Sequence, residues 1–326
     1  MIHRYVPLNS PEHIRILVLE PSLGHDAPLC FSFQQADLEA LQGEYDAISY
    51  TWGEPKLIFP LYNDDGWQVF VTENLDRALR RFRHKLDKRW LWADAVCINQ
   101  SDNKEKGTQI PLMARIFRGA RRVLAWLGPG GGENERGMRL MDRLSRRPSR
   151  MIQSQLHLAK NAENTLEMED ESNAHAIGQF LSMPWFNRLW IIQECVFNND
   201  LTLICGASEM SLSRFLAAIE RCKSDGLWGA LSSNSLSAIV KLAKLWKLHS
   251  MAEHVSTETS TAEILEMVNN SWLYDCSDDR DRIYALYSMA TNIAPLALAD
   301  TFHRQDVVLM DVDYSLDVLE TYRTFA

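Results

Sequence analysis

A glutamate inside an apolar segment is the first residue that could do chemistry. Glu194 stands in "PWFNRLWIIQECVF" (184–197), whose apolar spacing predicts one largely buried helix. A carboxylate in such surroundings must be paired with a cation, be neutral through a raised pKa, or have a functional role, because desolvating an unpaired charge is costly. Arg188 lies six positions earlier, an awkward separation on a helix, whereas Trp190 lies four positions earlier and shares a face with Glu194. An ion pair with a distant Lys or Arg and a chemical role both stay open.

A second candidate group lies where the segment "YDAISYTWGEP" (45–55) stops being a strand. The strand prediction covers Tyr45 to Tyr50, and Thr-Trp-Gly-Glu-Pro then places Trp52 where solvent or a ligand can reach it. Gly53 allows a sharp turn of the backbone there. Trp52 can therefore form the wall of a site or pack in the core, and the stretch alone leaves both open.

A third group follows the next predicted strand. "LWADAVCINQ" (91–100) ends in the hydrogen-bonding side chains of Asp94, Asn99 and Gln100. In open parallel sheets ligands bind outside the carboxyl ends of strands, so this cluster is a site candidate. The alternative is that Asp94 and Asn99 only cap a helix or shape a turn.

Several familiar kinds of site do not fit the sequence. The nine histidines show no metal-ligand spacing, and the six cysteines are scattered without a C-x-x-C pair, which is typical of reduced thiols in a cytosolic protein. The loop "GPGGGE" (128–133) follows a strand, but its glycine spacing fits neither a dinucleotide fingerprint nor a P-loop. We interpret it as a linker and expect no metal or bound cofactor.

Composition restricts the classes of partner. The chain has 326 residues, 46% of them hydrophobic and 24% charged, and a formal net charge of −9. This balance argues against a general binder of nucleic acid or anionic membranes. The basic segment 77–89 is interpreted as the solvated face of an amphipathic helix. No secretory signal is evident, and the longest uncharged run, 283–299, is too short to span a membrane comfortably.

The element pattern predicts a three-layer α/β fold with a parallel sheet. Residues 1–40 contain two short strands, 14–20 and 29–34, expected as a hairpin at the edge of a larger sheet. The core, 41–128 and 184–206, alternates strands with helices over 72–86 and 104–120. We expect 129–183 to be a helical insertion and 207–326 a C-terminal helical part, all in a single domain.

The motifs together resemble the fungal heterokaryon-incompatibility (HET) domain. "SYTWG" (49–53), "CINQ" (97–100) and "RLWIIQE" (188–194) stand in the family's order, within similar blocks that extend along most of the chain. Ala93, Lys106 and Phe117 depart from the usual pattern. The resemblance implies a cytoplasmic trigger of cell death after fusion of unlike fungal cells, with self-association and a protein partner in allorecognition.

A more distant similarity to TIR domains implies a chemistry and a flavodoxin-like strand order. "RLWIIQE" is similar to their Trp-x-x-x-Glu motif, so that Trp190 and Glu194 correspond to its tryptophan and its catalytic glutamate. This implies hydrolysis of NAD, or a related nucleotide, at the nicotinamide–ribose bond. The implied substrate-binding residues are Ser49, Tyr50, Trp52, Gly53, Asp94, Asn99, Gln100 and Trp190. The alternative is a non-catalytic signalling module that acts through assembly.

Overall fold

The fold is built on a nine-stranded sheet. The computed structural model describes residues 4–146, 171–224, 235–252, 271–287, 289, 293–294, 308–309 and 311–325. The strands lie in the order β5-β4-β2-β1-β6-β3-β7-β8-β9. Their bounds are β1 (His13–Leu19), β2 (Leu29–Asp37), β3 (Asp46–Tyr50), β4 (Phe59–Asn63), β5 (Gln68–Val71), β6 (Arg89–Trp92), β7 (Arg122–Gly128), β8 (Leu201–Cys205) and β9 (Ser208–Ser211). A separate short pair joins β10 (Ile293–Ala294) and β11 (Val308–Leu309).

Four consecutive parallel strands form the centre of this sheet. β3 pairs in parallel with both β6 and β7, and β7 pairs in parallel with β8. The chain passes through these strands in the order β3, β6, β7, β8, whereas in the sheet they lie in the order β6-β3-β7-β8. This is the start of the flavodoxin-like order, whose ligand crevice lies at the carboxyl ends of the strands. The predicted α/β class is therefore confirmed.

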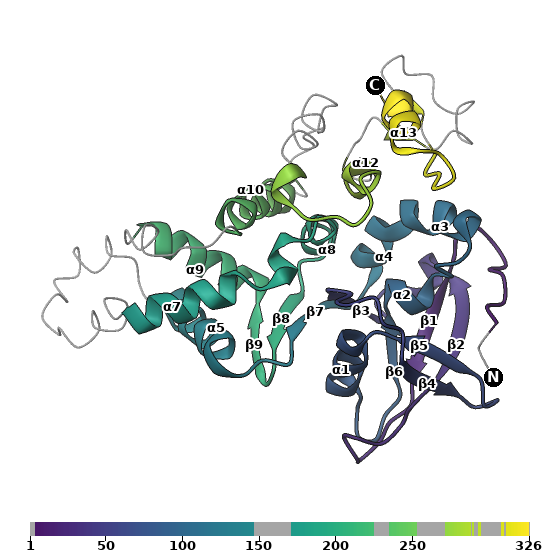
Figure 1. Ribbon diagram of the computed structural model, residues 1–326, viewed down its shortest axis with the longest axis horizontal. Helices are drawn as coiled ribbons and strands as arrows, with labels where there is room; N and C mark the ends of the chain where they lie inside the picture. The colour runs from purple at the N-terminus through teal and green to yellow at the C-terminus, as the bar shows by residue number, and fades with distance from the viewer. Residues whose placement is uncertain are drawn as a thin grey trace, which may run out of the picture.

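Helices cover both faces of the central strands (Figure 1). The longer ones are α1 (Glu73–Phe82), α5 (Gly132–Ser145), α7 (Glu171–Leu181), α9 (Leu212–Ser224) and α10 (Leu236–Ala252). The shorter ones are α2 (Asp94–Cys97), α3 (Asn103–Gln109), α4 (Met113–Gly119), α8 (Ile191–Val196), α12 (Asp281–Tyr287) and α13 (Val318–Phe325). The 3-10 turns are η1 (Glu39–Leu41), η2 (Ile110–Leu112), η4 (Pro184–Asn187) and η6 (Ser271–Leu273).

The register of β3 and β7 shows which helix lies on which face. Ser49 is level with Ala125, and Tyr50 is level with Trp126. Trp126 packs edge-on against Phe82 of α1, and its indole N–H donates to Asn74 of the same helix. Since side chains alternate along a strand, Ser49 points to the opposite face, where α8 lies. The centre of the fold thus has three layers.

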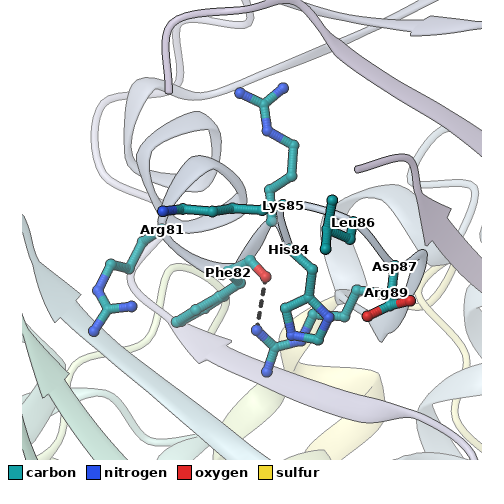
Figure 2. Close-up of a pocket in the computed structure, with 8 residues that line it drawn as sticks. Arg81, Phe82, His84, Lys85, Leu86, Asp87 and Arg89 are labelled. Atoms are coloured by element: carbon teal, nitrogen blue, oxygen red, sulfur yellow. Dashed lines mark hydrogen bonds between the residues drawn. The ribbon is translucent and has the colours of Figure 1, made fainter. Parts of the chain in front are cut away.

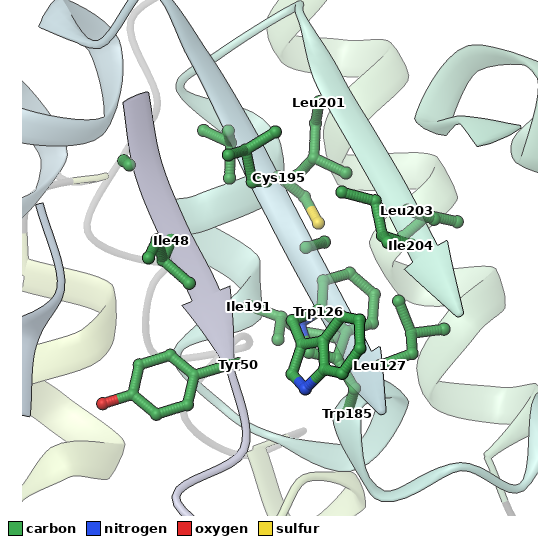
Figure 3. Close-up of a cluster of buried hydrophobic side chains, with 14 of the residues drawn as sticks. Ile48, Tyr50, Trp126, Leu127, Trp185, Ile191, Cys195, Leu201, Leu203 and Ile204 are labelled. Atoms are coloured by element: carbon green, nitrogen blue, oxygen red, sulfur yellow. The ribbon is translucent and has the colours of Figure 1, made fainter. Parts of the chain in front are cut away.

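Large apolar side chains fill the space between these layers. Ile48, Trp126, Trp185, Ile191 and Leu203 are almost completely buried, as Figure 3 shows for this part of the core. Full burial of an Ile or Leu side chain contributes about 1.5–3 kcal/mol to stability. The core therefore fixes both the central strands and the start of α8, on which the candidate glutamate lies.

The predicted N-terminal hairpin is present, but its expected place at the sheet edge is wrong. β1 and β2 pair antiparallel over their full length. β1 also pairs with β6, while β4 and β5 continue the sheet beyond β2. The strands β4 and β5 were not expected from the sequence. Because they cover the free side of β2, the hairpin lies inside the sheet.

Three predicted helices are shorter than expected. The helix expected over 72–86 ends at Phe82, because Arg83 leaves the helix and donates to the carbonyl oxygens of residues 24, 25, 27 and 28. The basic segment 77–89 is consequently only half helical. Pro111 divides the helix expected over 104–120 into α3, η2 and α4. The helix expected over 184–197 is divided into η4 and α8 by the extended residue Arg188.

The segments expected as insertion and C-terminal part both contact the sheet. Helices α5 and α7 pack closely enough that a Cβ at Gly137 would collide with the backbone of Ala176. The strand β9, within the region expected to be helical, pairs with β8. Residues 147–170 of the expected insertion lie outside the described residues, as does most of the uncharged run 283–299. Among the described helices, none has the length and apolar character needed to cross a bilayer.

Candidate functional site

Glu194 is buried at the carboxyl end of β3. Its side chain is 3% exposed, and it accepts a hydrogen bond from the Ser49 hydroxyl. The Ser49 oxygen in turn accepts the indole N–H of Trp185 at 2.7 Å. Arg188 completes the environment, with nitrogens 3.2 and 3.3 Å from the two carboxylate oxygens. The carboxylate is thus held by one guanidinium and one hydroxyl.

The pairing of Arg188 with Glu194 corrects the expectation that a separation of six residues is unsuitable. That expectation assumed one continuous helix. Instead, η4 ends at Asn187 and Arg188 has an extended backbone (φ −69°, ψ 136°), and α8 begins only at Ile191. Because Arg188 lies before the helix, its side chain can turn back to the carboxylate.

A more exposed group adjoins the carboxyl ends of β3 and β6. The indole N–H of Trp52 donates to the Asp94 carboxylate at 2.9 Å, and the amide of Gln100 donates to the Asp94 carbonyl at 2.8 Å. Trp52 is 42% exposed, which agrees with its expected access to solvent. Gly53 has a φ of +72°, a value that favours glycine and allows the sharp turn predicted there.

The side chain of Tyr50 lies between the buried and the exposed groups. Its hydroxyl is buried beside the Asp94 carboxylate, with which it interacts through both charge and hydrogen bonding. Burial raises the pKa of Tyr50 well above its usual value, the nearby Asp94 carboxylate raises it further, and Arg188 opposes the rise. The phenol is therefore neutral, and its buried oxygen is a polar atom that could serve a ligand.

Electrostatics link Glu194 to the same set of residues. Burial is the main cause that raises the pKa of Glu194; Arg188 and the Ser49 hydrogen bond oppose the rise, and the charge of Asp94 adds to it. The polar and ionisable groups at this site thus influence one another's pKa, as expected where two parallel strands end side by side. They belong to Ser49, Tyr50, Asp94 and Glu194.

Two of the predicted site residues make their contacts elsewhere. The side chain of Asn99 accepts the backbone N–H of Ser101, which is the turn-forming role considered as the alternative. The indole of Trp190 donates to Asp281 of α12 at 3.0 Å, and it packs against the small apolar cluster of Ile283, Tyr284 and Val312. Trp190 therefore joins α8 to the C-terminal helices.

Sequence reasoning missed two residues that complete the site. Trp185 and Arg188 both lie in the segment that was expected to be uniformly helical, where neither could reach Ser49 or Glu194. The signal was available in part. Pro184 shows only where the segment begins to turn, since proline is tolerated in the first turn of a helix and does not reveal the extended residue Arg188.

The arrangement offers an acidic and aromatic environment without a metal-ligand set. No group of three or more His, Cys, Asp or Glu within the described ranges could hold a metal ion. The chemical groups present are the Glu194 carboxylate, the Ser49 hydroxyl, the Asp94 carboxylate and the indole of Trp52. Carboxylates can stabilise a developing cation, and an indole can stack on a planar ring.

The fold and these groups define the class of protein, an α/β domain of flavodoxin-like order with a buried carboxylate at its central strand. Residues 45–194 match the model of the family described as Heterokaryon incompatibility protein (HET). This range begins at the first residue of the "YDAISYTWGE" block and ends on Glu194. The motifs predicted this similarity to the HET family.

A curated relative supports the same assignment. The chain is 25% identical over 345 aligned residues to "Heterokaryon incompatibility protein 6, OR allele" from Neurospora crassa. The alignment covers 90% of this chain and 50% of the relative, so the chain spans about half the length of the curated relative it matches. No solved structure matches the chain.

Proposed function

We propose that this protein triggers cell death in fungal heterokaryon incompatibility, and that it does so by hydrolysing NAD at the nicotinamide–ribose bond. The HET family match and the Neurospora crassa relative support the biological role. The observation that carries the chemistry is the position of Glu194. Its carboxylate lies beside Ser49 at the carboxyl end of the central strand of a flavodoxin-like sheet.

The proposed reaction requires a carboxylate and no metal. Nicotinamide leaves NAD as a neutral molecule, and the ribose carbon that it leaves acquires oxocarbenium character. A carboxylate facing that carbon stabilises the charge, and water then adds to it. Glu194 would have this role, with Ser49 orienting it and Trp52 stacking on a ring of the substrate.

Arg188 sets a requirement on this proposal. With Glu194 only 3% exposed and paired to Arg188, a substrate can reach the carboxylate only if the guanidinium moves. Arg188 is 17% exposed, so its outer side borders solvent. We therefore propose that the active form is an assembly or a partner-bound form in which Arg188 has turned away from Glu194.

The test is NAD consumption by the purified protein, alone and after activation in an assembly. Glu194→Gln keeps the size and a hydrogen-bond acceptor but removes the charge, and it should lower turnover about a hundredfold or more. Asp76→Asn is the control, since Asp76 is a buried carboxylate that pairs with Arg80 within α1. NAD consumption that is equal in the wild type and Glu194→Gln would rule out the enzymatic proposal.

Two contacts favour a second candidate, a non-catalytic signalling module. The Glu194–Arg188 pair and the Trp190–Asp281 hydrogen bond are also what a purely structural helix junction would need. Under this alternative, Glu194→Gln would leave cell killing intact wherever the variant remains folded. A fungal fusion assay that compares Glu194→Gln with wild type at equal protein levels separates the two candidates.

A further inference from the structure

A basic hollow lies at the end of the sheet opposite to Glu194. It is formed by the end of α1 and the loop that leads into β6, and its volume is about 550 Å³. Its lining residues are Arg81, Phe82, Arg83, His84, Lys85, Leu86, Asp87 and Arg89, most of which Figure 2 labels. Cavities of a few hundred cubic ångströms suit small ligands rather than folded partners.

The cations of this hollow are only partly neutralised. Arg81 pairs with Glu209 at 2.7 Å, and Arg89 pairs with the buried Asp46 at 2.7 Å. By contrast, Arg83 and Lys85 form no ion pair within 4.0 Å with any residue in the described part of the chain. The acidic group on the lining is the exposed Asp87. The hollow thus carries excess positive charge in a chain whose formal net charge is −9.

Neighbouring arginines add to this excess. The single carboxylate of Asp46 is shared by Arg89, Arg121 and Arg122, at 2.7, 2.9 and 3.5 Å. Three guanidinium groups around one carboxylate leave two positive charges without a partner. Because Asp46 and Arg89 begin their parallel strands, these charges lie at the amino ends of β3 and β6.

The hollow is also fixed in shape. The guanidinium of Arg83 donates to four carbonyl oxygens of the β1–β2 connection, which ties the loop to that connection. Arg89 donates to the Phe82 carbonyl at 2.7 Å, a bond drawn in Figure 2. Arg83 therefore contributes charge but has few donors to spare, while the exposed Lys85 retains all three of its N–H donors for a ligand.

We propose that this hollow binds a compact polyphosphate anion. Phosphoryl oxygens accept several hydrogen bonds and match both the lysine ammonium and the guanidinium groups. A group bearing at least two phosphoryl units balances the unpaired charges of Arg83, Lys85 and the arginines around Asp46. The site is separate from the Glu194 cluster, and the proposal does not depend on NAD hydrolysis.

The ionisation of His84 provides a readout for the same inference. Burial lowers the pKa of His84, and Arg89 lowers it further; Asp46 and Asp87 oppose this, and Arg121 lowers it slightly. The imidazole thus lies among charges of both signs, and burial is the main cause of its lowered pKa. An anion bound there should raise the pKa of His84, since it favours the charged imidazolium.

The experiment is calorimetric titration of the whole protein with inorganic triphosphate, compared between wild type and Lys85→Glu. We expect Lys85→Glu to weaken binding about tenfold or more, because it reverses a charge next to the ligand. Lys104→Glu is the charge-matched control. Lys104 is exposed on α3, beyond the carboxyl end of β6, and the control should change affinity less than about twofold.

Two further measurements make the outcome decisive. The pKa of His84, followed by NMR, should rise when triphosphate is added to the wild type. Vesicles with and without phosphatidylinositol bisphosphate distinguish a membrane headgroup from a free anion as the source of the phosphates. The proposal is overturned if neither triphosphate nor these vesicles bind the wild type better than Lys85→Glu, or if Lys104→Glu weakens binding equally.

Discussion

The two ends of strand β3 each hold a buried carboxylate, and they hold it differently. At the amino end, Asp46 is completely buried and surrounded by three arginines. At the carboxyl end, Glu194 packs against the strand with one arginine and one hydroxyl as its partners. Three guanidinium groups thus surround the single negative charge of Asp46, whereas only one guanidinium faces the charge of Glu194.

This difference separates a structural carboxylate from one suited to chemistry. At Glu194 the cost of burial outweighs the single guanidinium, and the pKa of the carboxyl is raised. Asp94 adds a second negative charge nearby. A group whose charge is only partly compensated is one that a ligand can stabilise, whereas the charge of Asp46 is already satisfied within the fold.

The largest effect is expected from Asp46→Ala. This change leaves Arg89, which is 8% exposed, without its buried partner. Removing one member of a buried ion pair costs about 3–5 kcal/mol. Urea denaturation should show this loss in the free energy of unfolding. If Asp46→Ala lowered the free energy of unfolding less than Ser49→Ala does, the ion pairs of Arg121 and Arg122 with Asp46 would contribute little to the stability of this end of the strand.

The next prediction concerns the pH dependence contributed by Glu194. Its pKa is raised in the folded state, so its contribution to stability is full below the unfolded-state value of about 4.3 and is lost as pH rises through the folded pKa. Wild type should therefore lose stability relative to Glu194→Gln as pH rises. Urea denaturation of both proteins between about pH 4 and 8 measures this. A difference that stays constant with pH contradicts the prediction.

Ser49→Ala should have a moderate effect. The substitution removes the hydroxyl that donates to Glu194 and accepts from Trp185, and the Trp185 indole N–H is then left buried without a partner. A buried unsatisfied polar group costs about 1–3 kcal/mol. The exposed Ser101→Ala is the control and should change the melting temperature little. Equal melting of Ser49→Ala and wild type would show that the hydroxyl is dispensable.

The smallest effect on stability is expected from Trp52→Phe. Trp52 is 42% exposed, and its hydrogen bond to Asp94 lies at the surface, so the loss should be below about 0.5 kcal/mol. Phenylalanine preserves an aromatic face but not the N–H. If Trp52 stacks on a ligand, Trp52→Ala should weaken ligand binding far more than Trp52→Phe, while both variants melt alike. Equal binding by the two variants would exclude stacking.

The sequence predicted the parts of the site that depend on strand order. Ser49, Trp52 and Asp94 were expected together because parallel strands present their carboxyl ends at one edge, and the structure has this arrangement. It did not predict the partner of Glu194. Apolar periodicity in 184–197 gave no sign of the extended residue Arg188, whose backbone conformation depends on packing of Trp185 and Phe186 into the core.

Similar reasons account for the differences in the fold. Periodicity located β1, β2, β3, β6, β7 and β8, although the strand expected over 89–98 ends at Trp92 because α2 begins at Asp94. The strands β4 and β5 are half-exposed and bracket a polar turn, so their pattern was too weak to predict. The indole of Trp190 could not be placed from spacing alone, because its partner Asp281 lies 91 residues further along the chain.

The position of β3 also has a consequence for how the protein folds. Asp46 of β3 is level with Leu91 of β6 on one side and with Arg122 of β7 on the other. Both strand pairings therefore close long loops. Such non-local contacts slow folding, whereas the local hairpins β1–β2 and β4–β5 can form early. The Ser49–Glu194 contact joins residues 145 positions apart. We therefore expect this contact to form late in folding, after β3, β7 and β8 have paired.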